Sequence, residues 1–185
     1  MKTFLEIGCA DFDTLLPLAA RGWRGFFIEP VERMRESLIR QAQKVGVNML
    51  DVEFAPICIS DHDGSIEMVE SLGDDWASGI SHVANGPNSG LLDHPLNQGF
   101  RGNIVTVPCE TLDTFIAKRN IVSLDFMKID VEGHELAVLE PYSWRVKPDL
   151  IKIEHKHSNL EVLRRILGRE GYHTYIEAED LYAIH

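Results

Sequence analysis

The chain has 185 residues, of which 44% are hydrophobic and 25% charged, a composition that fits one globular domain with a buried core. Its net charge of -11 argues against a nucleic-acid partner, because binding to phosphates depends on Lys and Arg. Three widely spaced cysteines, the lack of a signal peptide and the lack of a long apolar run predict a cytoplasmic protein with reduced thiols and no membrane attachment.

Apolar runs typical of strands alternate with amphipathic segments along the chain. Strands are predicted over residues 3–9, 25–29, 52–60, 66–69, 104–109, 126–131, 150–155, 172–177 and 181–184. Helices are predicted over about residues 14–20, 31–45, 112–119 and 160–167, and another is expected to open after Gly133. This alternation predicts an α/β domain with a mostly parallel sheet, helices on both faces and a closing hairpin from the last two strands.

The segment from Ser71 to Gly102 breaks this rhythm. It has little periodicity, holds six of the fourteen glycines, and contains Trp76, His82 and His94. Irregular segments of this length are usually functional or disordered. We interpret residues 71–102 as a lid or substrate loop within a single domain of residues 1–185, in preference to a linker.

Acidic residues and a glycine follow the first three predicted strands. Gly8 comes just after Glu6, where a glycine lets a nucleotide-like ligand approach the backbone. Glu29 lies 21 residues further on, where an acid can accept hydrogen bonds from ribose hydroxyls. Ser60 and Asp61 follow the third strand, where a carboxylate can accept from an adenine amino group. Each feature alone is also typical of a turn or helix cap, but in this order they predict an adenosine pocket.

A dinucleotide site is the alternative for this first loop. Such a site needs G-x-G-x-x-G, but Ala10 and Asp13 stand where the second and third glycines belong. Asp11 and Asp13 would repel a pyrophosphate and tolerate a cationic centre, which favours S-adenosylmethionine with its positive sulfonium. An NAD-type oxidoreductase is therefore less favoured. A non-catalytic module that binds an adenosyl ligand or assists assembly stays open.

The motifs, taken in chain order, resemble the FkbM family of S-adenosylmethionine-dependent methyltransferases. The most specific is Lys128-Ile129-Asp130-Val131-Glu132-Gly133-x-Glu135, supported by Glu6-Ile7-Gly8, Phe27-Ile28-Glu29-Pro30, Ile59-Ser60-Asp61, Thr111-Leu112-Asp113 and Ile153-Glu154-His155. The resemblance implies a class I methyltransferase (Rossmann-like) fold, with a mostly parallel seven-stranded sheet and a reversed hairpin strand at its edge. It also implies methyl transfer, usually to an oxygen of a sugar, a glycan or a small metabolite.

The resemblance assigns roles by position. It places Glu6 and Gly8 in the first cofactor motif, Glu29 at the ribose, Asp61 at the adenine and Asp130 beside the transferred methyl. The full set of predicted cofactor-binding residues is Glu6, Gly8, Cys9, Glu29, Pro30, Ser60, Asp61 and Asp130. The first loop departs from the family pattern, because Ala10-Asp11-Phe12 stands where a second glycine and an asparagine are common.

Two predicted strands end in the same arrangement of side chains. Lys128 and Asp130 are two residues apart, as are Lys152 and Glu154, so each pair lies on one face of its strand. If the strands are neighbours, Asp130 and Glu154 lie close together, which raises one pKa and creates a candidate base. The alternative is a structural network of lysines and carboxylates.

Histidines near these strand ends add further candidates. His155 has an ordinary pKa near neutrality, so the predicted catalytic residues are Asp130, Glu154 and His155. His155 and His157 with nearby acids resemble part of a metal site, but no complete ligand set is visible and no metal is predicted. His134 is expected to be peripheral.

Overall fold

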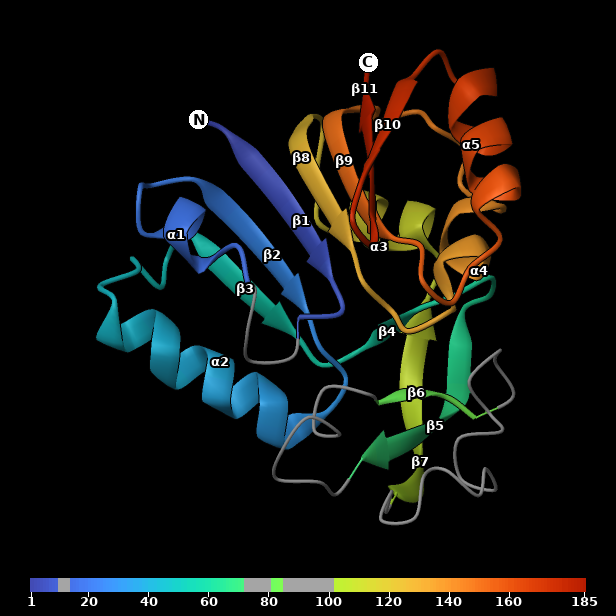
Figure 1. Cartoon of the computed structure of the whole chain (residues 1–185). Helices are drawn as coiled ribbons and strands as arrows, with labels where there is room; N and C mark the ends of the chain where they lie inside the picture. Colours follow the sequence, from blue (N-terminus) through green and yellow to red (C-terminus); the bar gives the residue numbers. More distant parts are fainter. Residues whose placement is uncertain (10–13, 72–80, 85–101) are drawn as a thin grey trace.

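The computed structural model describes residues 1–9, 14–71, 81–84 and 102–185 (Figure 1). Its main sheet has seven strands in the order β10-β11-β9-β8-β1-β2-β3. These are β1 (Thr3–Ile7), β2 (Arg24–Ile28), β3 (Val52–Ala55), β8 (Leu124–Ile129), β9 (Pro148–Glu154), β10 (His173–Glu177) and β11 (Asp180–Ile184). β11 pairs antiparallel with both β9 and β10, and the other pairs are parallel. The predicted mostly parallel sheet with an antiparallel edge hairpin is confirmed.

Helices cover both faces of the main sheet. α1 (Leu16–Ala19) and α2 (Glu32–Lys44) pack on one face, and α3 (Leu112–Lys118), α4 (Glu135–Leu139) and α5 (Leu160–Arg169) on the other (Figure 1). Successive side chains of β1 point to opposite faces of the sheet, which gives the domain two hydrophobic cores. Leu5 and Ile7 pack under α3, α4 and α5, whereas Phe4 packs under α1 and α2. All five residues of β1 are buried, as expected for a central parallel strand.

A second sheet of four strands faces the carboxyl ends of the main sheet (Figure 1). Its order is β4-β7-β5-β6, formed by β4 (Cys58–Ile59), β5 (Gly64–Ser71), β6 (His82–Val83) and β7 (Gly102–Glu110). The prediction of one strand over residues 52–60 was wrong, because the chain leaves the main sheet at Pro56 and enters the second sheet at Cys58. Proline has no N–H to continue the ladder, so it ends β3.

The predicted lid falls mostly on residues 72–80 and 85–101, which lie outside the described residues together with residues 10–13 of the first loop. In the described part, Ser71 ends β5, Gly102 begins β7, and β6 lies between them in sequence. His82 in β6 is 1% exposed and pairs with Val69 of β5. This short strand was not predicted, because two residues are too few for a periodic pattern.

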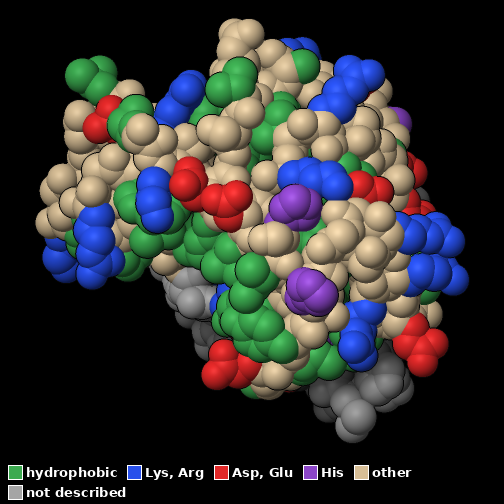
Figure 2. All heavy atoms as spheres, turned by 90° about the horizontal axis from the view of Figure 1, so that it is seen from above, with side chains coloured by type: hydrophobic (Ala, Val, Ile, Leu, Met, Phe, Trp, Pro, Cys, Tyr) green, Lys and Arg blue, Asp and Glu red, His purple; other side chains and the backbone are tan. Residues whose placement is uncertain are grey.

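The molecular surface away from the second sheet is mixed in charge. Seen from above, over the amino ends of the main-sheet strands, acidic and basic side chains lie interspersed with hydrophobic ones (Figure 2). In the described ranges, no helix has both the length and the apolar character needed to cross a membrane.

Candidate active site

A cavity lies at the carboxyl ends of β1, β2, β8 and β9, between the main sheet and the second sheet. In open α/β sheets, ligands bind at this edge. The polar residues of the wall are Glu29, Ser81, Asp130, Glu132, His134 and Glu154, whereas the apolar wall includes Met34, Ile57, Ile59, Met68 and Val83. Among the described residues that line the cavity, none is Lys or Arg. The cavity wall is therefore acidic.

Gly8 brings two strand ends into direct contact at the cavity. Its φ is +78°, its N–H donates to the Ile28 carbonyl at 3.0 Å, and the Asp130 N–H donates to the Ile7 carbonyl at 2.9 Å. A Cβ at position 8 would lie 1.8 Å from the Asp130 carbonyl oxygen. Glycine is therefore required both by the left-handed conformation and by the close approach of the β8 loop.

Glu6 lies outside the cavity wall and binds the backbone just before α1. It is fully buried, and its Oε2 accepts a hydrogen bond from the Leu15 N–H at 2.8 Å. Its Oε1 lies 3.4 Å from Nζ of Lys128, which is 3% exposed and lies 3.7 Å from Oδ2 of Asp130. The alternative prediction of a structural lysine–carboxylate network therefore describes Lys128 well.

Glu29 stands at the end of β2 with its carboxylate on the cavity wall. The residue is 6% exposed, and its Oε1 accepts a hydrogen bond from the Val31 N–H at 2.9 Å. This bond fixes the carboxylate at the start of α2. Gly8, Cys9, Pro30 and Asp130, which were also predicted to bind a cofactor, line the same cavity.

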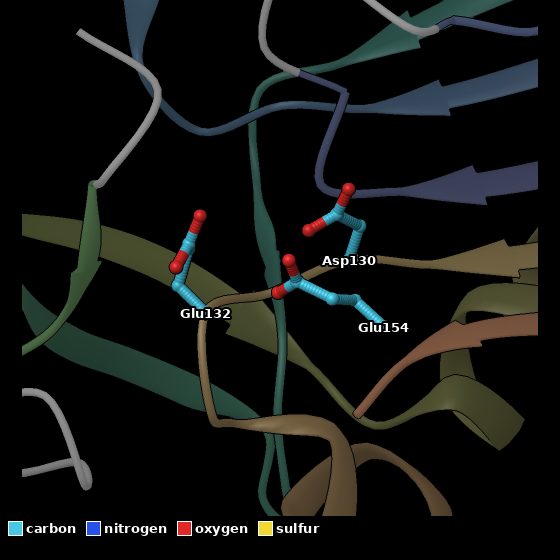
Figure 3. Close-up of side chains that lie close together, drawn as sticks. All are labelled: Asp130, Glu132 and Glu154. Carbon is cyan, nitrogen blue, oxygen red and sulfur yellow. The ribbon is translucent and has the colours of Figure 1, made fainter. Parts of the chain in front are cut away.

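Three carboxylates converge at the end of the cavity next to β9 (Figure 3). β8 and β9 are adjacent, with Ile129 opposite Ile153, so the residues that follow, Asp130 and Glu154, meet as the spacing predicted. Glu132 is the third member, and one oxygen of each residue lies within 4.8 Å of the others. Oxygen ligands at this spacing suit a divalent cation or a cationic ligand.

The acidic cluster of Asp130, Glu132 and Glu154 holds protons near neutral pH. Burial and the neighbouring Glu154 raise the pKa of Glu132 to about 8. Burial and the neighbouring Asp130 raise the pKa of Glu154 to about 7. Close carboxylates cannot all ionise at their ordinary pKa, and the titration belongs to the group as a whole. The cluster can therefore take up or release a proton in the neutral range.

Lys128 and His157 flank the cluster but do not line the cavity. Lys128 lies 3.7 Å from Asp130, and Nε2 of His157 lies 3.8 Å from Oε2 of Glu132. Lys152, in contrast, pairs with Asp180 at 3.1 Å. The negative charge of the cluster is thus partly offset by the protein itself.

The loop from β8 to α4 is shaped by Glu135. This residue is 1% exposed, and its Oε1 accepts hydrogen bonds from the N–H groups of Val131 and Gly133 at 3.2 and 3.1 Å. Its Oε2 accepts a hydrogen bond from the Ser158 hydroxyl. Glu132 and Gly133 adopt φ values of +54° and +96° in this turn. Glu135 therefore supports the loop from behind, while Glu132 projects into the cavity.

Besides Glu6, three predicted site residues lie outside the cavity wall: Ser60, Asp61 and His155. The Asp61 side chain is 64% exposed and binds His62 at 2.7 Å, and Ser60 is fully buried. His155 is half-buried, and its Nε2 has no hydrogen-bond partner in the described part of the protein. His134, which was expected to be peripheral, lines the cavity and lies 3.0 Å from the Ser60 hydroxyl.

Other cavity residues were not predicted as site residues. Glu132 is one of the three acidic groups that follow the strand in the most specific motif, with Asp130 and Glu135, but it was given no catalytic or cofactor-binding role. The apolar residues from the second sheet carry no local signal, because they reach the cavity only through pairing of β4, β5 and β6 with distant parts of the chain.

Comparison with known proteins gives one family. The description "Methyltransferase FkbM domain" matches residues 6–174. No curated protein has significant sequence similarity to the chain.

The solved structures that are similar to this one include two enzymes. Methyltransferase FkbM from Methylobacillus flagellatus KT is 14% identical with a TM-score of 0.62, over 100% of this chain and 43% of that protein. Precorrin 8w decarboxylase from Methanobacterium thermoautotrophicum is 13% identical with a TM-score of 0.48, over 99% of this chain and 80% of that protein. The chain thus spans less than half the length of the Methylobacillus flagellatus protein, with which it shares a Rossmann-like class I fold.

Proposed function

Because the chain belongs to the FkbM family of methyltransferases, we propose that it uses S-adenosylmethionine to methylate a hydroxyl of a sugar, a glycan or a small metabolite. The observation that carries this proposal is the acidic cavity. Four carboxylates line it, and no Lys or Arg does so among the described residues. Acidic groups attract a positive sulfonium and repel the pyrophosphate of a dinucleotide.

The residues at the strand ends fit this cofactor. Glu29 would accept hydrogen bonds from the ribose hydroxyls, and Gly8 places the end of β1 on the cavity wall, next to the ligand. Asp130 would face the positive sulfur. The cofactor itself supplies an electrophilic methyl group. The protein's part is to bind, to align the acceptor hydroxyl and to receive its proton.

Glu154 is the group best placed to receive that proton. It lies on the cavity wall beside Asp130, and its pKa is raised to about 7. A general base is most effective when its pKa is close to the pH at which the enzyme works. Asp130 stays next to Lys128, which stabilises its charged form. We therefore assign the base to Glu154 and the electrostatic role to Asp130.

Glu29→Ala should weaken binding of S-adenosylmethionine by about 1.5–3 kcal/mol, because charged hydrogen bonds to the ribose are lost. Isothermal titration calorimetry measures this change. Glu36→Ala is the matched control, since its side chain on α2 is 59% exposed and away from the cavity, and should bind like the unchanged protein. Tighter binding of NAD than of S-adenosylmethionine would instead support an oxidoreductase.

Glu154→Gln should lower turnover by about 10²–10⁴-fold and leave cofactor affinity nearly unchanged. Turnover of the unchanged protein should rise with pH through about 7, because Glu154 must lose its proton to act as a base. Methyl transfer to a panel of hydroxyl acceptors, measured from pH 5.5 to 9, checks both results.

Further variants test the other members of the site. Asp130→Asn should lower both turnover and cofactor affinity. If His155 is catalytic, His155→Ala should lower turnover and leave cofactor affinity nearly unchanged. EDTA should leave turnover unchanged, because Lys128 already offsets part of the charge of the cluster and no metal is predicted to take part. Cofactor binding without transfer to any acceptor would point to a non-catalytic adenosyl-binding module.

A further inference from the structure

His134 joins the two sheets at the cavity wall. It belongs to the loop between β8 and α4, whereas Ser60 directly follows β4 of the second sheet. The His134 Nε2 lies 3.0 Å from the Ser60 Oγ, and Ser60 is fully buried. The three residues before Ser60 line the same cavity as His134. One nitrogen of the His134 ring is therefore anchored in the protein beside the apolar part of the wall.

The hydrogen bonds around Ser60 determine which atom carries the proton. The Ser60 Oγ lies 3.2 Å from Oδ1 of Asp61, which also lies 2.7 Å from Nδ1 of His62. Hydrogen bonds from His62 and Ser60 hold the pKa of Asp61 below its ordinary value, so this side chain is an ionised carboxylate that only accepts. The single hydroxyl proton of Ser60 therefore goes to Asp61, and the Ser60 oxygen accepts from Nε2–H of His134.

The remaining nitrogen of His134 is then an acceptor. Burial lowers the pKa of His134, so the ring is neutral at pH 7 and carries one proton. With that proton on Nε2, the lone pair is on Nδ1. Within the described part of the chain, the bond to Ser60 is the one hydrogen bond of the ring. Because His134 lines the cavity, Nδ1 is the ring nitrogen left to accept a hydrogen bond from a ligand there.

We propose that Nδ1 of His134 accepts a hydrogen bond from the 6-amino group of adenine and makes the site selective for adenine over 6-oxo purines. This inference rests on the proposed use of S-adenosylmethionine. Pro30, Met34 and Ile57 on the same wall suit the flat apolar faces of a purine. A 6-oxo purine would set its carbonyl oxygen against the Nδ1 lone pair, which leaves both acceptors unpaired.

His134 thus takes the adenine contact that the sequence predicted for Asp61. The Asp61 side chain is 64% exposed and faces His62. Asp61 acts instead as a positioning residue, because it takes the Ser60 proton and so orients the His134 ring.

Competing titrations of S-adenosylhomocysteine and its 6-oxo analogue S-inosylhomocysteine test the proposal by calorimetry. The unchanged protein should prefer the adenine ligand by about 10- to 100-fold. His134→Phe keeps a flat ring without an acceptor and should lose most of this preference. His134→Asn places an amide oxygen near the position of Nδ1 and should retain part of it. Glu29→Ala is the matched control and should weaken both ligands to the same extent, since both carry the ribose.

Nitrogen-15 NMR of the ligand-free protein gives a second readout that does not depend on binding. Nε2 of His134 should be protonated and Nδ1 unprotonated. A full adenine preference in His134→Phe, or a proton on Nδ1, would overturn the proposal while S-adenosylmethionine binding stands. If the unchanged protein binds neither ligand, the proposed function itself fails and this inference falls with it.

Discussion

Lys128→Met is expected to lower the free energy of unfolding by about 3–5 kcal/mol, because it leaves the buried carboxylate of Glu6 without its cation. Glu6 is fully buried and Lys128 is 3% exposed, so water cannot replace the lost partner. The same lysine lies beside Asp130, so the cavity wall should also be disturbed. The change is measured by urea unfolding at pH 7, with circular dichroism as the signal.

Lys152→Met is the matched control for this variant. Lys152 lies directly opposite Lys128 in the register between β8 and β9, and it pairs with Asp180. Its side chain is 16% exposed and that of Asp180 is 28% exposed, so solvent screens the pair and the loss should be about 1 kcal/mol or less. Adding Glu6→Gln to Lys128→Met should recover part of the stability. Equal losses in the two lysine variants would contradict the buried ion pair.

Gly8→Ala is expected to cost about 2–5 kcal/mol of stability, combining the strain of a left-handed alanine with a steric clash. The added Cβ would lie 1.8 Å from the Asp130 carbonyl oxygen, which belongs to backbone and cannot rotate away. The ends of β1 and β8 would be forced apart, and with them the two sides of the cofactor site. Cofactor affinity should therefore fall by about tenfold or more, as measured by calorimetry.

Gly22→Ala separates the two contributions. Gly22 has a φ of +83°, close to the +78° of Gly8, but a Cβ there would meet no atom within 4 Å among the described residues. Its substitution should cost only the conformational strain of about 1–2 kcal/mol and leave cofactor affinity unchanged. A Gly8→Ala protein that is as stable as Gly22→Ala would show that the strand ends can separate freely.

The strands of the main sheet were predictable because each one is marked by a local run of apolar residues. Apolar runs identified these strands, and the equal Lys-x-acid spacing of β8 and β9 correctly predicted that Asp130 and Glu154 lie close together. The sequence did not predict that β4, β5, β6 and β7 form a separate sheet. β4 pairs with β7, about fifty residues away in the chain, and its two residues are too few to show a pattern.

The site could be predicted only in part for a related reason. A strand-terminal acid such as Glu29 indicates a ligand contact directly. Glu6 has the same pattern in sequence, but in the structure it pairs with the buried Lys128 and lies outside the cavity wall. His134 was underestimated because its partner Ser60 is 74 residues away in the chain.

The position of β1 between β2 and β8 constrains how the protein folds during synthesis. β1 pairs with β2 early in the chain, but its other edge pairs with β8, where Phe4 lies opposite Phe126. That edge stays open until more than two thirds of the chain has left the ribosome, and a long-range parallel pairing of this kind forms slowly. An open edge on an apolar strand is a template for aggregation. Nascent chains that stall before β8 should therefore depend on chaperones that cover this strand.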